Sequence, residues 1–508
     1  MNSQTPTPIV GPIFNQDNTD FFFSRTPDQM SVQEIHAYID RLADAGIGTF
    51  VSCCSAMKAN YASEVWECEW SGYDPAGPDD QPVLQYLPKE SIRPTRNRLD
   101  AVKRLADQGI DFHHEALARC RQRGVGAWLS IRMNDVHACM DEDNPLLSRF
   151  FVQHRAARKL RAMHRDRYWM DRALDWEQPD VQEHYFKLVR EVLNRYDLDG
   201  LELDWMRFVV HFRPGRELEG GKVITAWMQQ VKAECAKAEQ RWGHPIKLGA
   251  RVPTRPETAR RLGLDGVAWA KEGLIDLLVV TPFWATTDFD VPVAEWKRLL
   301  EGTAVHFAVS TEVRYQPAPE GPAQMISPEL LAGLGATIFH GGADSVYLFN
   351  IFPAGHGLDK LWGPQNFNAI IGSLRSLKTV AARERVHAVT YHDVRAPGEP
   401  LGNALPATDR KWDQPSPGGF GFRVQTGPKP ERGRACELTI EWAEPVPDAK
   451  QVRTYLNARE LKIVASEKGV WRYAVPVEAF ENEAQVIDIE TPGTDTVVRV
   501  ELRVAADA

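Results

Sequence analysis

Hydrophobic and polar residues alternate strictly in the stretch 198–208, directly after a turn. Leu201 and Leu203 fall on one face of an extended chain, and Glu202 and Asp204 fall on the other. In a β/α barrel, one face of each strand contacts the helices and the other points into the barrel. The pattern therefore predicts two carboxylates on the inner face of a barrel strand, near its carboxyl end, where such barrels carry their chemistry. A buried ion pair with an arginine is the alternative for either carboxylate.

Strand-like and helix-like patterns alternate through the first 384 residues. Strands are expected in the apolar run that starts at Pro12 and then at 47–54, 125–135, 198–208, 246–253, 275–284, 304–313 and 343–352. Helices are expected at 31–45, 99–123, after Pro179, and at 221–241, 256–272, 292–301, 328–335 and 366–382. Eight strands that each precede a helix predict an α/β fold, the closed (β/α)8 TIM barrel. Two long connections interrupt it, and connections of such length are usually functional. They are 55–98 and 136–178.

The pattern changes after residue 384. The stretch 394–419 is rich in Pro, Gly and Asp, and short alternating runs follow it at 437–442, 451–455, 470–475, 484–489 and 496–504. Evenly spaced short strands separated by turns are typical of an antiparallel β-sandwich. We therefore predict a catalytic barrel at 1–384, a linker or loop at 385–419, and an accessory β-sandwich at 420–508. The sandwich would either bind a ligand or brace the barrel.

The composition is that of an ordinary globular protein and narrows the range of partners. A chain of 508 residues is long enough for one large domain and one smaller one. The 60 basic and 69 acidic residues leave a net charge of −9, which disfavours a nucleic acid as partner. No apolar stretch is long enough to cross a membrane, and the amino terminus lacks the basic and apolar regions of a signal peptide. We expect a cytoplasmic protein as written, or a periplasmic or secreted one if a signal peptide was removed. The oligomeric state is left open.

Motifs for metal, phosphate or serine chemistry are missing from the sequence. It contains 14 histidines but no His-Glu-x-x-His, and it has neither a Gly-x-Ser-x-Gly motif nor a glycine-rich phosphate loop. The seven cysteines are scattered without Cys-x-x-Cys spacing, which favours buried thiols over a metal site or a disulfide framework. We therefore expect no metal and no cofactor.

Polar residues cluster at the expected ends of strands three to eight, where barrel enzymes place residues that act together. Cleavage of a glycosidic bond needs two carboxyl groups that flank the bond. The candidates are Asp204 and Glu312, with Glu202 one layer deeper to hold Asp204 or an arginine in position. The candidates for substrate binding are Arg132, Asn134, Asp135, Arg207, Arg251, Trp284, Arg314, Asn350, Trp66 and Trp176.

The arginines and the tryptophans each have a second interpretation. Arginine forks bind carboxylates and sulfates in bidentate fashion, so four arginines at strand ends favour an anionic glycan, uronic or sulfated. The same arginines could equally neutralise the carboxylates of the site. Tryptophans offer stacking faces for sugar rings, but those of the long connections could also form small cores of their own. The tryptophans in question are Trp66, Trp70, Trp169 and Trp176.

Three segments together resemble the family-10-like glycosyl hydrolases: 173–176, 196–208 and 342–350, within a similar region of roughly 120–355. The pattern Asp-Gly-x-x-x-Asp-x-x-Arg-Phe, which starts at Asp199, is the most specific part. The resemblance implies a barrel fold, a carbohydrate substrate and an acidic site residue at the end of strand four, which matches Asp204. In the broader superfamily of retaining glycosidases, a Glu ends strand seven, where Glu312 lies. An Asn-Glu pair ends strand four in that superfamily, and this sequence departs from it at Leu203 and Asp204.

We therefore predict a glycoside hydrolase that cleaves O-glycosidic bonds of an oligosaccharide or polysaccharide by a two-carboxylate acid/base mechanism. A glycan-binding barrel without catalytic activity is the first alternative. A polysaccharide lyase that acts on uronic sugars through a Tyr or His base is the second.

Overall fold

The computed structural model describes residues 8–141, 143–153, 172–400, 405–408, 418–481, 484–493 and 495–507. The chain divides into two compact units. The first consists of 1–280, 300–308 and 347–364, and the second of 281–299, 309–346 and 365–508. The second unit therefore contains the carboxyl-terminal sheets together with segments from the later part of the barrel.

The described residues contain a closed barrel of eight strands, in the order β1-β10-β7-β6-β5-β4-β3-β2. In chain order these strands are β1 (Ile13–Gln16), β2 (Thr49–Ser55), β3 (Gly126–Arg132), β4 (Gly200–Asp204), β5 (Lys247–Pro253), β6 (Leu277–Thr281), β7 (His306–Ser310) and β10 (Ser345–Leu348). Nearly all of their side chains are buried, as expected when helices cover one face of each strand and the barrel interior covers the other. The TIM barrel predicted from the sequence is confirmed.

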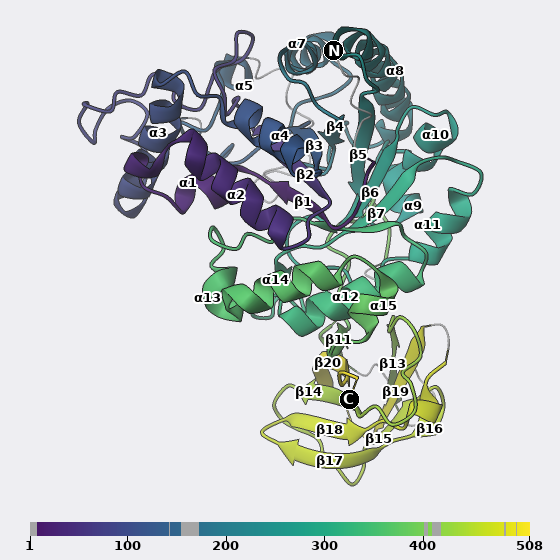
Figure 1. Ribbon diagram of the computed structural model, residues 1–508. Coiled ribbons are helices and arrows are strands. Elements are labelled where there is room, and N and C mark those ends of the chain that lie inside the picture. Colours follow the sequence, from purple (N-terminus) through teal and green to yellow (C-terminus); the bar gives the residue numbers. More distant parts are fainter. Residues whose placement is uncertain are drawn as a thin grey trace. The chain divides into compact units, whose positions relative to one another are not determined.

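Helices separate most of the barrel strands, and in the first unit they lie outside the ring of strands (Figure 1). From the amino terminus they are α1 (Asn18–Phe23), η1 (Pro27–Gln29), α2 (Val32–Asp44), α3 (Lys89–Asp107), α4 (Phe112–Gln122), α5 (Arg149–Gln153), α7 (Pro179–Arg195) and α8 (Glu217–Trp242). They continue with α9 (Pro256–Arg261), α10 (Gly266–Lys271), α11 (Val293–Leu299), α12 (Pro328–His340), α13 (Leu358–Trp362), α14 (Pro364–Ser373) and α15 (Leu377–Ala381). Among the described residues, no helix combines the length and the apolar character needed to span a membrane.

Three of the predicted helices are divided, and in each case the prediction of one continuous helix was wrong. The segment 99–123 forms the end of α3 and the whole of α4, because Gly109 between them has a φ of +73°, which a right-handed helix cannot continue through. Asp111 then starts α4 by accepting two backbone hydrogen bonds with its side chain. The segments 256–272 and 366–382 are likewise divided, into α9 and α10 and into α14 and α15.

Apolar side chains fill the barrel interior beneath the carboxyl ends of the strands. Their cluster contains Ile13, Val51, Trp128, Leu277, Val279, Ala308, Tyr347 and Phe349. Trp128 also explains why β4 begins with Gly200, because a Cβ atom at this position would lie 2.5 Å from the indole ring. The glycine of the Asp-Gly motif is therefore required by packing.

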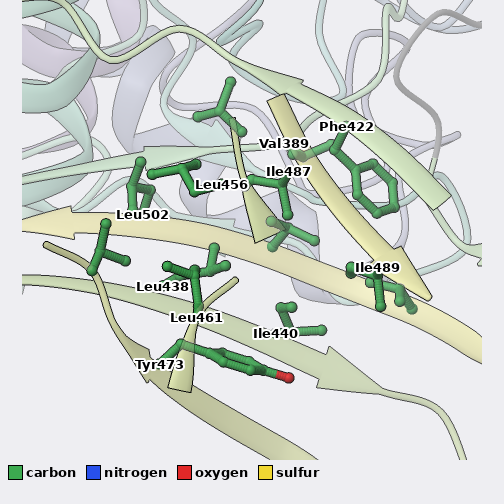
Figure 2. Close-up of a cluster of buried hydrophobic side chains, with 14 of the residues drawn as sticks. Val389, Phe422, Leu438, Ile440, Leu456, Leu461, Tyr473, Ile487, Ile489 and Leu502 are labelled. Atoms are coloured by element: carbon green, nitrogen blue, oxygen red, sulfur yellow. The ribbon is translucent and has the colours of Figure 1, made fainter. Parts of the chain in front are cut away.

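Two antiparallel sheets in the second unit share one hydrophobic core, which confirms the predicted sandwich. In the described part of the chain, one sheet has the order β11-β20-β14-β18-β17 with β12 beside β20, and the other has the order β13-β19-β15-β16. Buried and half-buried residues alternate along β14, so that Leu438 and Ile440 point to the core, where they lie near Ile487 and Ile489 of the other sheet (Figure 2). The strands are β11 (Arg385–Ala388), β12 (Ala407–Thr408), β13 (Gly418–Val424), β14 (Cys436–Trp442), β15 (Arg453–Leu456), β16 (Arg459–Glu460), β17 (Lys462–Glu467), β18 (Val470–Ala474), β19 (Gln485–Thr491) and β20 (Thr496–Val504). The remaining short elements are the hairpin strands β8 (Arg314–Tyr315) and β9 (Gln324–Met325) and the helix η4 (Val477–Ala479).

Part of the stretch predicted as linker is regular structure. Strand β11 lies at its start and pairs antiparallel with β20, from Arg385 opposite Val504 to Ala388 opposite Glu501. The prediction missed β11 because its four residues precede a Pro- and Gly-rich sequence and their partner strand is more than a hundred residues away. Residues 401–404 and 409–417 of the predicted linker lie outside the described residues.

Candidate active site

Strand β4 places Glu202 and Asp204 on the inner face of the barrel, as the alternating pattern predicted. The strand pairs in parallel with β3 and β5, and this register sets Asp204 beside Arg132 on one side and Arg251 on the other. All three residues end their strands or lie near the end, so one carboxylate and two guanidinium groups meet at the carboxyl edge of the barrel. This edge is where TIM barrels carry their sites.

Asp204 is held by two contacts. Arg251 donates a hydrogen bond from Nη1 to Oδ2 over 2.6 Å, and the backbone N–H of Met206 donates to Oδ1 over 3.0 Å. Asp204 and Arg251 are each 1% exposed. A charge-assisted hydrogen bond in such a buried position is short and strong.

Phe349 forms the apolar wall of this ion pair. The guanidinium of Arg251 lies 3.9 Å from the centre of the Phe349 ring, and that of Arg207 lies 5.0 Å from it. Phe349 follows directly after β10 and is 2% exposed, so its ring is fixed by the barrel interior. The two arginines therefore gain cation–π stabilisation, and their long side chains have little freedom to move.

Glu202 lies one layer deeper and is completely buried. Its Oε1 atom accepts hydrogen bonds from the hydroxyl of Ser130 at 2.8 Å and from that of Tyr347 at 2.9 Å, while Oε2 has no hydrogen-bond partner among the described residues. Burial raises the pKa of Glu202 to about 7; Arg251 opposes this rise, and the charge of Asp204 adds to it. At neutral pH the carboxyl group is therefore protonated in a large fraction of molecules.

A second group of charges follows the end of β3. Arg132 donates to Asp17 at 2.6 Å and to Asp135 at 3.2 Å, and Asp135 also contacts the imidazole Nδ1 of His137 at 2.8 Å. Burial alone would raise the pKa of Asp135, but the charges of His137 and Arg132 and the hydrogen bonds from His137 hold it below its usual range. Asp135 is therefore an ionised acceptor that orients the guanidinium of Arg132 and the imidazole of His137.

Asn134 and Trp176, both predicted to bind substrate, make their contacts within the protein. The side-chain amide of Asn134 donates to the carbonyl groups of Leu174 and Val210 and accepts the N–H of Leu174. Trp176 is fully buried, and its ring lies 4.8 Å from that of Trp205 in an edge-on arrangement. In this structure both side chains join the loops behind the strand ends.

The long connection 55–98 uses its tryptophans in packing. The ring of Trp66 stacks on that of His184 at 4.3 Å and donates its N–H to the His184 carbonyl. Trp70 packs against a small core formed by Tyr73, Leu84 and Leu99. Trp169 of the other long connection lies outside the described residues.

The remaining candidates differ in exposure. In the second unit, Glu312 lies two residues after β7 and is 1% exposed, and its carboxylate accepts the backbone N–H of Val313 at 2.8 Å. Arg314 is exposed and begins β8, and Trp284 is half-buried. In the first unit, the half-buried Asn350 has a φ of +59°, and its carbonyl accepts a hydrogen bond from His356 at 2.6 Å.

Sequence reasoning missed five residues that contact the charged strand ends. Tyr347 on β10 and Phe349 directly after it follow the alternating pattern, which could have placed both inside the barrel together with Glu202. The other three are Asp17 and Ser130, whose partners Arg132 and Glu202 come from other parts of the barrel, and His137, whose partner Asp135 lies only two residues away in the sequence. Among the described residues, no group of three or more His, Cys, Asp or Glu side chains could hold a metal ion.

The closed barrel and its charged strand ends place the protein in the class of TIM-barrel proteins that carry their site at the carboxyl edge of the sheet. The family model of glycosyl hydrolase-like 10 matches residues 88–242. This region contains β3 and β4 with Arg132, Glu202 and Asp204, and the match confirms the resemblance seen in the sequence. The chain therefore has a TIM barrel that contains a region similar to the glycosyl hydrolase-like 10 family.

Solved structures of glycoside hydrolases are similar to this chain at low sequence identity. The glycoside hydrolase domain of PgaB (BpsB) from Bordetella bronchiseptica is 10% identical, with 72% of this chain and 99% of that chain covered and a TM-score of 0.40. A noncanonic maltogenic α-amylase, AmyB from Thermotoga neapolitana, is 9% identical over 93% of this chain and 97% of that chain, with a TM-score of 0.37. The Thermotoga maritima α-fucosidase is 11% identical over 92% and 81%, with a TM-score of 0.34. The search of curated proteins found no match.

Proposed function

We propose that this protein is a glycosidase that hydrolyses O-glycosidic bonds, with Asp204 and Glu312 as the two carboxylates and Glu202 in support. The observation that carries the proposal is the position of Asp204 at the carboxyl end of β4. There it lies in register with Arg132 and Arg251, inside the region that matches the glycosyl hydrolase-like model. In this proposal catalysis belongs to the barrel at 1–384, and the sandwich at 420–508 is an accessory domain.

The ion pair between Asp204 and Arg251 supports the role of a charged carboxylate. Cleavage of a glycosidic bond builds positive charge on the anomeric carbon, and an ionised carboxylate nearby stabilises this charge. Asp204 is suited to that task because Arg251 and the N–H of Met206 fix both of its oxygens. Glu312 is then the carboxylate that acts as nucleophile or activates water. The proton for the leaving oxygen must come from a third group.

Protonation of Glu202 removes a negative charge that would repel the carboxylate of Asp204. Two residues of strand separate the positions of the two carboxyl groups by about 6.6 Å. Two negative charges at that distance, in an effective dielectric of about 20, repel each other by about 2.5 kcal/mol. A pKa of about 7 for Glu202 removes much of this repulsion near neutral pH.

The arginines alone do not decide between neutral and anionic glycans. Arg132 and Arg251 already bind carboxylates of the protein. This agrees with the second interpretation of the arginines given above, in which they neutralise carboxylates of the site. The contacts of Arg132 and Arg251 therefore do not favour a uronic or sulfated substrate over a neutral one. A neutral or acidic oligosaccharide is the proposed substrate class, and the proposed role is carbohydrate degradation.

The test is the release of new reducing ends from a panel of neutral and acidic oligosaccharides. Asp204→Asn and Glu312→Gln should each lower the rate by at least about a hundredfold, since loss of one carboxylate removes a charge that the transition state needs. The matched controls are Asp80→Asn and Glu320→Gln, which make the same chemical changes at exposed positions and should retain the wild-type rate.

Two outcomes would contradict the proposal. Cleavage that survives Glu312→Gln would remove Glu312 from the mechanism and make Asp135 the next carboxylate to test. Measurable binding of a glycan by a protein that cleaves none of the panel would instead indicate a glycan-binding barrel.

A further inference from the structure

Asp135 and His137 form a hydrogen-bonded acid–imidazole pair just after β3. The Nδ1 atom of His137 lies 2.8 Å from one carboxylate oxygen of Asp135 and 3.0 Å from the other, and the backbone N–H of His137 also donates to Asp135 at 2.9 Å. Because an ionised carboxylate only accepts hydrogen bonds, Nδ1 must carry a proton. Proton exchange with a substrate then falls to Nε2.

Within this pair, Asp135 is held in place by burial, whereas the ring of His137 is accessible. The side chain of Asp135 is fully buried and also contacts Arg132, whereas 31% of the His137 side chain is exposed. The ring of Phe208 packs against the imidazole at 5.1 Å in an edge-on arrangement. The imidazole is therefore held on two sides and still reaches solvent.

The charges near the imidazole connect it to the candidate active site. Among the described residues, Asp135 contacts the imidazole directly; Arg132, paired with Asp17, contacts Asp135, and Arg207 precedes the packed Phe208. Arg132 is in turn the register neighbour of Asp204. The pair thus belongs to the same strand ends as the proposed catalytic carboxylate.

We propose that His137 is the proton donor of the glycosidase reaction and that Asp135 is its positioning residue; this inference rests on the proposed function. His137, as an imidazolium ion, would give its Nε2 proton to the glycosidic oxygen. The bond from that oxygen to the anomeric carbon breaks, and the electron pair stays on the oxygen. Water adds to the anomeric carbon, its proton passes to the carboxylate base, and both groups return to their starting states by exchange with solvent.

The test compares two substrates that share one sugar, chosen as a sugar that the wild type cleaves in the panel described above. An alkyl glycoside has a poor leaving group that needs a proton, and a dinitrophenyl glycoside has a good leaving group that does not. General acid catalysis typically contributes about a hundredfold or more. His137→Gln should therefore lower kcat/KM for the alkyl glycoside by about that factor and leave the dinitrophenyl glycoside within about threefold.

Two further variants separate catalysis from structure. His36→Gln is the matched control, because His36 also faces a carboxylate, Glu115 at 3.3 Å, and is 28% exposed; both substrates should be cleaved at the wild-type rate. Asp135→Asn should show the same leaving-group pattern as His137→Gln, and the double variant should be no slower on the alkyl glycoside than His137→Gln alone. Thermal unfolding of each variant verifies that it is folded.

The outcomes distinguish this inference from the proposed function. If the wild type cleaves no glycoside, the proposed function fails and the inference fails with it. If the wild type cleaves both substrates and His137→Gln, folded, slows both equally or neither, His137 is not the proton donor. In that case the proposed function stands and the inference alone is overturned.

Discussion

Replacing Glu202 with Gln should change how the stability of the protein depends on pH. Glu202 is completely buried, and its pKa rises from 4.5 to about 7 in the folded protein. Below pH 4.5 the carboxyl group is protonated in both folded and unfolded chains. Between pH 4.5 and about 7 the unfolded chain loses this proton while the folded barrel keeps it, so the free energy of unfolding falls as the pH rises. Above about pH 7 the folded barrel has also lost the proton, and the free energy of unfolding falls no further on account of Glu202.

The size of the effect follows from the difference in pKa. A rise from 4.5 to about 7 is about 2.5 pKa units, and each unit corresponds to about 1.4 kcal/mol, so the total is about 3 kcal/mol. Gln has nearly the same shape as Glu and does not ionise, and its carbonyl oxygen can accept the hydrogen bonds from Ser130 and Tyr347. Any cost of the new amide N–H₂ group is independent of pH. The stability of Glu202→Gln relative to the wild type should therefore increase by about 3 kcal/mol from pH 4.5 to pH 8.

Urea unfolding followed by tryptophan fluorescence measures this difference at several pH values between 4.5 and 8. When the free energy of unfolding of the variant is subtracted from that of the wild type, the contributions of groups that titrate equally in both proteins cancel. The control is Glu301→Gln, since Glu301 is exposed; its stability relative to the wild type should stay constant with pH. A constant difference for Glu202→Gln as well would refute the reasoning, because Glu202 would then ionise equally easily in the folded and unfolded chains.

Two further substitutions test the packing and the ion pair at the strand ends. Arg251→Met should destabilise the barrel by about 3–5 kcal/mol in urea, because it leaves Asp204 buried and charged. Adding Asp204→Asn should recover most of that loss, and equal stability of the single and double variants would show that the ion pair is not the cause. Gly200→Ala should lower the stability by about 1–3 kcal/mol in thermal unfolding, because the new Cβ atom overlaps the ring of Trp128. An unchanged midpoint would mean that Trp128 can move aside.

The residues on the inner face of β4 could be predicted from the sequence alone. Side chains alternate along any strand, so the order of Leu201, Glu202, Leu203 and Asp204 places both carboxylates on one face whatever surrounds them. The alternation of strand and helix patterns likewise predicted the barrel, because parallel strands joined by helices have few other ways to bury both faces. Breaks within helices were harder to predict. At Gly109 the break depends on a positive φ that a single glycine permits but does not require.

The binding candidates show where sequence reasoning was less informative. Asn134 lies at a predicted strand end and Trp176 in the long connection that follows it, yet both side chains make their contacts within the protein. The sequence does not distinguish a tryptophan that stacks on a sugar from one that packs on Trp205, because residue type and position along the chain can be the same for both. Only the fold determines which neighbours reach the ring. Arg132 and Arg251 illustrate the same point, because their carboxylate partners come from other strands and loops.

The sequence by itself determined the class of fold, the facing of Glu202 and Asp204, and the family resemblance of the strand that carries them. These are local properties, set by backbone geometry and by residues within about ten positions of one another. The tertiary structure decided which charges from distant parts of the chain meet: Asp204 with Arg251, and Arg132 with Asp17. It also decided that Glu202 is buried deeply enough to keep its proton near neutral pH. These distant partners are brought together by the order of the strands around the closed barrel. Burial depends on every element that packs over a side chain. Neither can therefore be obtained from the local pattern.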